Sequence, residues 1–212
     1  RDLIDRAEAL SCSQLPILLL GKNGSGKGIL AAYLHAQSTR SESRFVTIDC
    51  QSLPPLRQTE AVFGTDEEQI ERGILWQAVF GTVFFKNIEY MSAELQDKIY
   101  EMLSHQLPRR TAAFRGGYNI RCLFASDLSL EELYARGFLT ERFLNLVQTY
   151  VLEMPELEPD QETFLPVFSS ILAACAQKHR CMTPALSEEL KKAVCQRERT
   201  KLRDLYQIAE LI

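Results

Sequence analysis

The stretch "LPILLLGKNGSGKG", Leu15–Gly28, is the most informative part of this sequence for its fold. Its apolar run has the length of a strand and is typical of a strand buried on both faces of a parallel sheet. The glycine-rich part matches G-x-x-x-x-G-K, and "GILAAYLHAQS" follows it with the apolar spacing of a helix. A strand, this loop and a helix in that order predict a phosphate-binding P-loop rather than a plain glycine turn.

The loop provides a set of predicted nucleotide contacts. Its glycines let the backbone curl so that successive N–H groups face a phosphate, and Lys27 reaches toward the terminal phosphates. Gly28 stands where a serine or threonine would normally give an oxygen to magnesium. The predicted nucleotide-binding residues of the loop are Gly21, Asn23, Gly24, Ser25, Gly26, Lys27 and Gly28.

Strands and helices alternate through most of the chain. After a helix over residues 3–10 and the strand before the loop, we expect strands in "RFVTIDC", "GTVFF", "IRCLFAS" and "TYVLEM". Helices are expected in "SAELQDKIYEMLSHQ", opened by Ser92, and in "SLEELYARG", which ends at Gly137. This alternation predicts an α/β fold with a mainly parallel five-stranded sheet flanked by helices.

Beyond Pro155 the apolar spacing becomes helical throughout, as in "ETFLPVFSSILAACAQKH" and "SEELKKAVCQ". We therefore expect an α/β nucleotide-binding subdomain over residues 1–158 and a small all-helical lid subdomain over residues 159–212. The chain begins at Arg1 without an initiator methionine, so we expect it to be a fragment of a larger protein.

The composition argues against several classes of protein. A net charge of −4, with 46% hydrophobic and 25% charged residues, is typical of a globular domain and not of one that binds nucleic acid through its overall charge. The sequence shows no membrane-length apolar run and no signal peptide. Six scattered cysteines indicate reduced thiols and a cytoplasmic location. Cys175, His179 and Cys181 lack an evident fourth ligand, so no metal site is expected there.

Five segments together resemble the AAA+ central domain of bacterial enhancer-binding proteins, which activate sigma-54 RNA polymerase. Their order and spacing make the resemblance specific. It implies a P-loop AAA+ fold with a helical lid, binding of ATP or ADP, and a nucleotide contact from Arg203 in the sensor II segment. The segments are Leu15–Cys50, "SLPPLRQTEAVFG" (Ser52–Gly64), "GILWQAVFGTVFF" (Gly73–Phe85), "IRCLFASDLSLEELYARGF" (Ile120–Phe138) and "LRDL" (Leu202–Leu205).

The chain departs from this family where the family's magnesium chemistry is placed. Lys86 and Asn87 replace the two Walker B acids, which removes the carboxylates that organise magnesium and orient the attacking water. Asp127 takes the sensor I asparagine position, and Asp49 takes that of the asparagine that restrains the catalytic glutamate. The resemblance therefore implies a site at which magnesium is not required or not bound.

The family's two arginine fingers fall on Thr140 and Leu146, so neither position carries a cation for a neighbouring subunit's nucleotide. With the departures at the Walker B and sensor I positions, this leaves no catalytic residue to assign. We expect ATP hydrolysis to be absent or very weak.

Three charged side chains are predicted to meet at the carboxyl edge of the sheet. The resemblance places the second, third and fourth strands side by side, with Asp49, Lys86 and Asp127 each at a strand end. We predict that Lys86 lies between the two aspartates as a partly buried ion-pair triad, in the space of magnesium and its water. Two alternatives stay open, namely that Lys86 contacts a bound phosphate or that it is solvated at a loop edge.

The segment between Gly64 and Gly73 bears on the partners. The family's sigma-54-contacting GAFTGA loop belongs there, but "TDEEQIER" is too short to hold it. We therefore expect a degenerate AAA+ domain of a bacterial transcriptional regulator that binds ATP, ADP or a related ligand without hydrolysing it. RNA polymerase contact and self-association are expected through the full-length protein, DNA binding through a domain outside this chain, and no membrane contact.

Two other functions stay open. An active P-loop ATPase could take its acids from Asp49, Glu89 or Asp127. Alternatively, the domain could be a pure protein-interaction or oligomerisation module with a relic P-loop.

Four arginines gather around "FRGGYN" (Phe114–Asn119). They could contact an anion such as nucleotide, RNA polymerase or DNA, but a solvated hairpin rim is the favoured interpretation. These arginines are Arg109, Arg110, Arg115 and Arg121.

Overall fold

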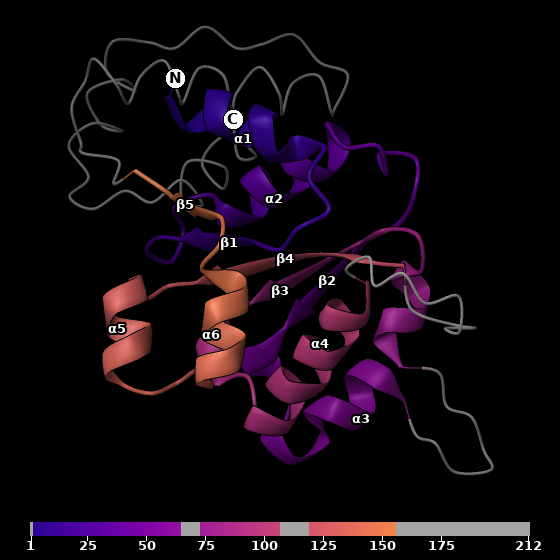
Figure 1. Ribbon diagram of the computed structural model, residues 1–212, viewed down its shortest axis with the longest axis vertical. Coiled ribbons are helices and arrows are strands. Elements are labelled where there is room, and N and C mark those ends of the chain that lie inside the picture. Colours follow the sequence, from indigo (N-terminus) through magenta and orange to yellow (C-terminus); the bar gives the residue numbers. More distant parts are fainter. Residues whose placement is uncertain (1, 65–72, 107–118, 156–212) are drawn as a thin grey trace, which may run out of the picture. The chain divides into compact units, whose positions relative to one another are not determined.

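The computed structural model describes residues 2–64, 73–106 and 119–155, and all structural statements below refer to these ranges (Figure 1). The α-helices are α1 (Asp2–Ser11), α2 (Lys27–Ala36), α3 (Gln58–Phe63), α4 (Ala93–Gln106), α5 (Leu130–Ala135) and α6 (Glu141–Val147). The strands are β1 (Ile17–Leu20), β2 (Phe45–Asp49), β3 (Thr82–Lys86), β4 (Arg121–Ser126) and β5 (Val151–Glu153). Short 3-10 turns cover Cys50–Ser52, Pro55–Arg57, Ile74–Ala78 and Ile88–Tyr90.

The five strands form one sheet in the order β2-β3-β4-β1-β5, and every neighbouring pair is parallel. The predicted α/β fold with a five-stranded, mainly parallel sheet is therefore confirmed. In this order, β1 leads into the glycine loop from between β4 and β5 (Figure 1). The carboxyl ends of β2, β3 and β4 consequently lie next to one another, at the edge where ligands bind in open α/β sheets.

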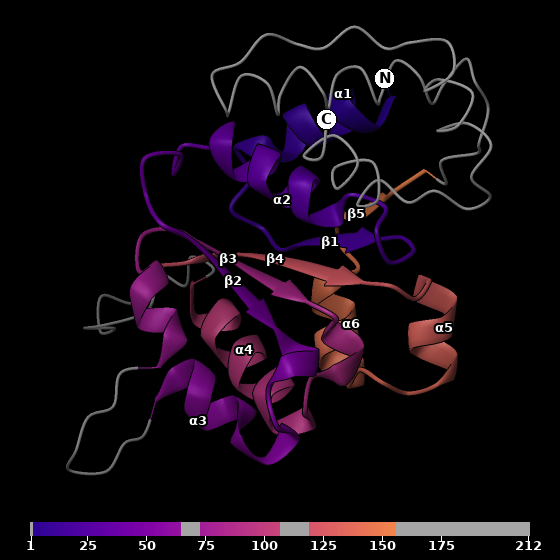
Figure 2. The same ribbon diagram turned by 180° about the vertical axis from the view of Figure 1, so that it is seen from behind.

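Helices cover both faces of the sheet. Helices α1 and α2 lie on one face, and α3, α4 and α6 lie on the other (Figures 1 and 2). All four residues of β1 and all six of β4 are buried, which explains why their sequences are almost continuously apolar. The edge strand β2 is only partly buried, and its Thr47 is exposed.

Aromatic side chains join the sheet to α6. The Phe85 and Phe124 rings stack at a centroid distance of 5.3 Å, and Phe143 of α6 meets Phe124 edge-on, also at 5.3 Å. All three residues are fully buried. Offset and edge-on aromatic pairs of this kind add stability beyond the apolar area that they bury. These rings hold α6 against the face of the sheet that lies opposite α1 and α2.

Arg121 is fully buried, so the favoured interpretation of a solvated hairpin rim is wrong for this arginine. Its guanidinium donates one hydrogen bond to Leu34 O in α2 and another to Leu10 O in α1, each at 3.0 Å. Both carbonyls lie in the last turn of their helix, where a cation is favoured by the helix dipole. Burial, and then the charge of Arg40, lower the pKa of Arg121 to about 10, so it stays charged at neutral pH. The other three arginines of the predicted cluster lie outside the described residues.

The chain divides into two compact units. The first comprises Arg1–Gly21 and Lys27–Glu153, and the second comprises Lys22–Gly26 and Met154–Ile212. The predicted boundary at residues 158 and 159 and the helical lid lie outside the described residues and stay predictions. Within the described ranges, no helix is long and apolar enough to cross a membrane.

Candidate functional site

The glycine loop adopts the backbone that its sequence predicts. Gly24 and Gly26 have φ angles of 84° and 95°, in the region that L-residues with a side chain rarely adopt. The Ser25 N–H donates to Lys22 O at 3.1 Å and closes a turn within the loop. Helix α2 begins immediately afterwards at Lys27. Consecutive N–H groups in such a turn, followed by a helix N-terminus, suit the binding of an anion.

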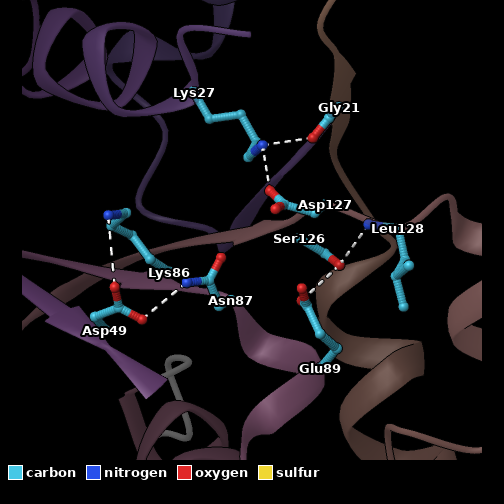
Figure 3. A network of polar contacts seen from close by, with 9 residues as sticks. All are labelled: Gly21, Lys27, Asp49, Lys86, Asn87, Glu89, Ser126, Asp127 and Leu128. Carbon is cyan, nitrogen blue, oxygen red and sulfur yellow. Dashed lines mark hydrogen bonds and ion pairs between the residues drawn. The ribbon is translucent and has the colours of Figure 1, made fainter. Parts of the chain in front are cut away.

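Lys27 is held by two oxygen atoms of the chain (Figure 3). Its ammonium donates to Gly21 O and to Asp127 Oδ1, the second at 2.7 Å. The Lys27 side chain is 10% exposed and that of Asp127 is 31% exposed. Asp127 follows β4 directly and thus reaches the lysine from a strand end. This Lys27–Asp127 ion pair was not predicted from the sequence.

Lys86 and Asp49 are register partners at the ends of β3 and β2. Lys86 Nζ lies 3.7 Å from Asp49 Oδ2, with the two side chains 44% and 35% exposed. The predicted triad is therefore right in its Lys86–Asp49 pair and wrong in its Lys86–Asp127 pair, because Asp127 pairs with Lys27. The edge carries two separate ion pairs, since the carboxylate at the end of β4 points to the loop lysine (Figure 3).

Asn87 completes the Asp49 side of the site. Its Nδ2 donates to Asp49 Oδ1 at 2.8 Å, and the Gln51 N–H donates to the same oxygen at 3.1 Å. Asn87 has φ 55° and ψ 52°, a left-handed conformation in which asparagine is enriched. The chain therefore turns sharply after β3, and Lys86 and Asn87, at the predicted Walker B positions, both contact the Asp49 carboxylate.

Glu89 lies just beyond this turn and contacts the end of β4. Its Oε2 accepts a hydrogen bond from Ser126 Oγ at 2.7 Å, and the Leu128 N–H donates to the same hydroxyl at 3.1 Å. Ser126 is fully buried. Glu89 is one of the acids that an active ATPase could use, and its partner Ser126 was not predicted from the sequence. A serine ending a fully buried strand was the available signal for that partner.

The two predicted finger positions hold Thr140 and Leu146, which contact other parts of the domain. Thr140 precedes α6, and its N–H donates to Gln96 Oε1 at 2.6 Å. Leu146 is partly buried against the main apolar core. Of the nearby arginines, Arg142 is exposed and Arg136 pairs with Glu132 at 3.5 Å. Arg203, Cys175, His179 and Cys181 lie outside the described residues.

The donor set at this edge does not fit magnesium, which binds oxygen ligands in a near-octahedral arrangement. An ammonium ends β3, the carboxylates of Asp49 and Asp127 are each paired with a lysine, and Gly28 offers no hydroxyl. Within the described ranges, no three His, Cys, Asp or Glu residues are grouped to hold a metal. Cys50 adjoins Asp49, but burial raises the pKa of its thiol to about 12, which keeps it protonated.

Gly64 and Gly73, which bracket the segment "TDEEQIER", approach each other closely. A Cβ on Gly73 would come within 2.4 Å of Gly64 N and 2.3 Å of the Phe63 carbonyl carbon. The backbones at Gly64 and Gly73 are therefore in direct contact, which only glycine at position 73 allows. The segment itself lies outside the described residues.

Comparisons with known proteins support the fold and indicate a family. The sequence profile described as "Sigma-54 interaction domain" matches residues 1–153. The chain is 27% identical over 197 residues to the transcriptional regulatory protein TyrR of Enterobacter agglomerans, covering 90% of this chain and 38% of TyrR. It is 28% identical over 206 residues to the alginate biosynthesis regulator AlgB of Pseudomonas syringae pv. tomato, covering 91% of this chain and 44% of AlgB.

Among solved structures, NtrX from Brucella abortus in complex with ADP has a TM-score of 0.78 to this chain at 23% identity. The match covers 99% of this chain and 48% of NtrX, and NtrX in complex with ATP has the same TM-score. This likeness concerns the fold. The chain spans less than half the length of each of these three relatives.

Proposed function

Because this chain belongs to the family of sigma-54 interaction domains, with the fold of P-loop AAA+ domains, we propose that it is a nucleotide-responsive module of a bacterial transcriptional regulator. In this proposal it binds ATP or ADP without magnesium and does not hydrolyse it. The loop contacts the phosphates through Gly21, Asn23, Gly24, Ser25, Gly26, Lys27 and Gly28, and Arg203 adds a contact from the other end of the chain.

The Lys86–Asp49 ion pair is the observation that carries this proposal. In a hydrolysing P-loop enzyme, an acid at the end of this strand organises the metal. Here a cation holds that place and faces Asp49 at 3.7 Å, with Asn87 on the other oxygen of the same carboxylate. A cation cannot ligate magnesium, and a carboxylate paired in this way is a poorer ligand for it. The ion pair thus supports binding without metal and without hydrolysis.

The glycine loop supports retained phosphate binding. Its two left-handed glycines and the helix start at Lys27 keep the backbone that cradles phosphates. NtrX, which shares the fold, has been solved with ADP and with ATP. A loop serving only as a connector would not need this geometry. The pairing of Lys27 with Asp127 is compatible with nucleotide binding, because a phosphate oxygen can also contact the Lys27 ammonium.

The regulatory role is inferred from the relatives. TyrR and AlgB are transcriptional regulatory proteins more than twice as long as the matched segment. We infer that DNA binding resides in a part of the protein outside this chain and that self-association and RNA polymerase contact depend on the full-length protein. Since only eight residues separate Gly64 from Gly73, we further propose that the domain lacks the sigma-54-contacting loop.

Calorimetric titration of ATP and of ADP in the presence of a chelator tests the proposal. The wild-type chain should bind at least one of them, and Lys27→Ala should weaken binding by about a hundredfold because a charge-assisted phosphate contact is lost. Lys98→Ala, which removes an exposed lysine of α4, is the matched control and should bind as the wild type does. No binding by the wild type would reject the proposal in favour of a protein-interaction module with a relic loop.

A second candidate function is supported by the Glu89–Ser126 hydrogen bond. This bond holds a carboxylate at 2.7 Å from the end of β4, beside Asp127 (Figure 3). Glu89 and Asp127 are thus the best candidates for the catalytic acids of an ATPase with relocated carboxylates. A steady-state ATPase assay with magnesium separates the two functions. Turnover that Glu89→Gln abolishes and Glu94→Gln, on exposed α4 surface, leaves intact would favour the relocated-acid ATPase.

A further inference from the structure

Asp127 places a negative charge next to Lys27 Nζ, the atom that should bind the terminal phosphate. Its Oδ1 lies 2.7 Å from Lys27 Nζ, and the Lys27 side chain is 90% buried by its surroundings. An ammonium has three N–H donors, and those of Lys27 are directed at Asp127 and Gly21 O among other contacts. A phosphate that reaches Lys27 must therefore displace Asp127 or share the ammonium with it.

The β- and γ-phosphates of a nucleotide differ in the contacts that they can make besides Lys27. The N–H groups of a P-loop cradle the α- and β-phosphates, and its lysine reaches the β- and γ-phosphates, so the γ-phosphate lacks the backbone cradle and depends on the lysine and on magnesium. At this site the donor set does not fit magnesium, so the γ-phosphate would depend on Lys27. A diphosphate keeps its backbone cradle, and a triphosphate places its extra charge where Asp127 already lies.

The geometry makes the repulsion direct. Two oxygens that accept from one ammonium at hydrogen-bond distance lie about 4.5 Å apart, which follows from tetrahedral N–H directions. The single positive charge of Lys27 cannot neutralise both the Asp127 carboxylate and a γ-phosphate, so the excess negative charges repel each other at this separation. Lys86, the second ammonium at this edge, is directed at Asp49 and does not pair with Asp127. The charge of Asp127 is therefore not relieved by the lysine that replaces the metal-binding acid.

We propose that Asp127, through its ion pair with Lys27, makes this site select a nucleoside diphosphate over a metal-free nucleoside triphosphate. The inference rests on the proposed nucleotide binding and adds its ligand preference. Asp127 acts here as a specificity residue. It repels the γ-phosphate electrostatically, and it pairs with Lys27, the residue that would contact that phosphate. The domain would then respond to the concentration of the nucleoside diphosphate without hydrolysing any nucleotide itself.

The test compares ADP and ATP affinities in a chelating buffer for the wild type, Asp127→Asn and Asp97→Asn. The wild type should bind ADP about tenfold more tightly than ATP, and Asp127→Asn should bring the two affinities within about twofold by strengthening ATP binding. Asp97→Asn makes the same chemical change on the exposed surface of α4 and should keep the wild-type ratio. Circular dichroism melts confirm that the variants are folded.

Two results would overturn the inference, and they differ in what they say about the proposed function. If ADP binds but the ADP-to-ATP affinity ratio is the same in the wild type and in Asp127→Asn, the selectivity is wrong and nucleotide binding stands. If neither protein binds either nucleotide, both the selectivity and the proposed function are rejected.

Discussion

Lys86 and Asp49 face each other as register partners of two parallel strands, with Lys86 Nζ 3.7 Å from Asp49 Oδ2. Both side chains are more than one third exposed, so the pair adds little to stability, and its role is positional. It directs the ammonium to the carboxyl edge of the sheet, beside the residues that follow β4. In the proposed function this is the edge at which nucleotide binds, with the usual ligands of its metal replaced.

Replacing Asn87 should separate its two structural contributions. Asn87→Ala loses the hydrogen bond to Asp49 and strains the left-handed backbone, so the free energy of unfolding should fall by about 2 kcal/mol. Asn87→Gly loses the same hydrogen bond without that strain and should cost about 1 kcal/mol. Urea unfolding of the two variants measures the difference. Equal losses would show that the backbone conformation at position 87 is not a source of strain.

The buried guanidinium of Arg121 should be needed for stability. Arg121→Met removes hydrogen bonds to the last turns of α1 and α2 at a cost of about 2 to 4 kcal/mol, because the Leu34 carbonyl loses its guanidinium partner and Leu10 O keeps only the hydrogen bond from the Ser13 N–H. Arg136→Met, which removes an exposed arginine paired only with Glu132 of the same helical segment, should cost at most about 0.5 kcal/mol. Chemical denaturation compares the variants. Similar costs for both would contradict the bridging role of Arg121.

Stability should fall on acidification because of His35. Its ring is buried against Phe45 and its Nδ1 lies 2.9 Å from Thr82 Oγ1, and burial lowers the pKa of His35 below its usual value. The unfolded chain, with a His pKa of about 6.5, then binds more protons than the folded chain, so stability decreases as the pH falls below about 6.5. Denaturation midpoints at about pH 5.5 and about pH 7.5 measure this, and His35→Gln should show a smaller difference between them. An unchanged difference would assign the pH dependence to other groups.

Two glycine substitutions should have opposite outcomes. Gly73→Ala forces a Cβ to within 2.4 Å of backbone atoms and should destabilise the domain by more than about 2 kcal/mol. In Gly28→Ala the nearest neighbour is Phe84 Cε1 at 3.9 Å, which is ordinary contact, and the helical position should gain up to about 1 kcal/mol. Thermal melts of both variants check the prediction. A tolerated Gly73→Ala would show that the backbones at Gly64 and Gly73 can separate.

Much of the fold could be predicted from local sequence. The fully buried strands β1 and β4 appear in the sequence as apolar runs between turn residues, and Ser92 accepts from the Leu95 N–H at 3.3 Å as the predicted cap of α4. Helix α6 was missed although Phe143, Leu144 and Val147 have the spacing of one buried helix face. Helix α3, with six residues, is too short for its apolar spacing to distinguish it from a loop.

The partners of charged side chains were harder to predict. Placing Asp49, Lys86 and Asp127 at neighbouring strand ends followed from the resemblance, and Lys86 does pair with Asp49. The choice between Lys86 and Lys27 as partner of Asp127 depends on side-chain direction at the end of β4, which sequence spacing does not determine. For the same reason Arg121 could not be identified as buried, since its two carbonyl partners are 87 and 111 residues away in the chain.

The proposed magnesium-independent binding is tested by the affinity of the wild-type chain for ATP and ADP, measured with magnesium and with a chelator. If Lys86 takes the place of a metal-binding acid, as proposed, the affinities for each nucleotide should agree within about threefold in the two conditions. Lys86→Asp is the matched variant and should make ATP binding depend on magnesium. A wild-type affinity for ATP that rises more than about tenfold with magnesium would contradict the account, because the metal would then have ligands at this site.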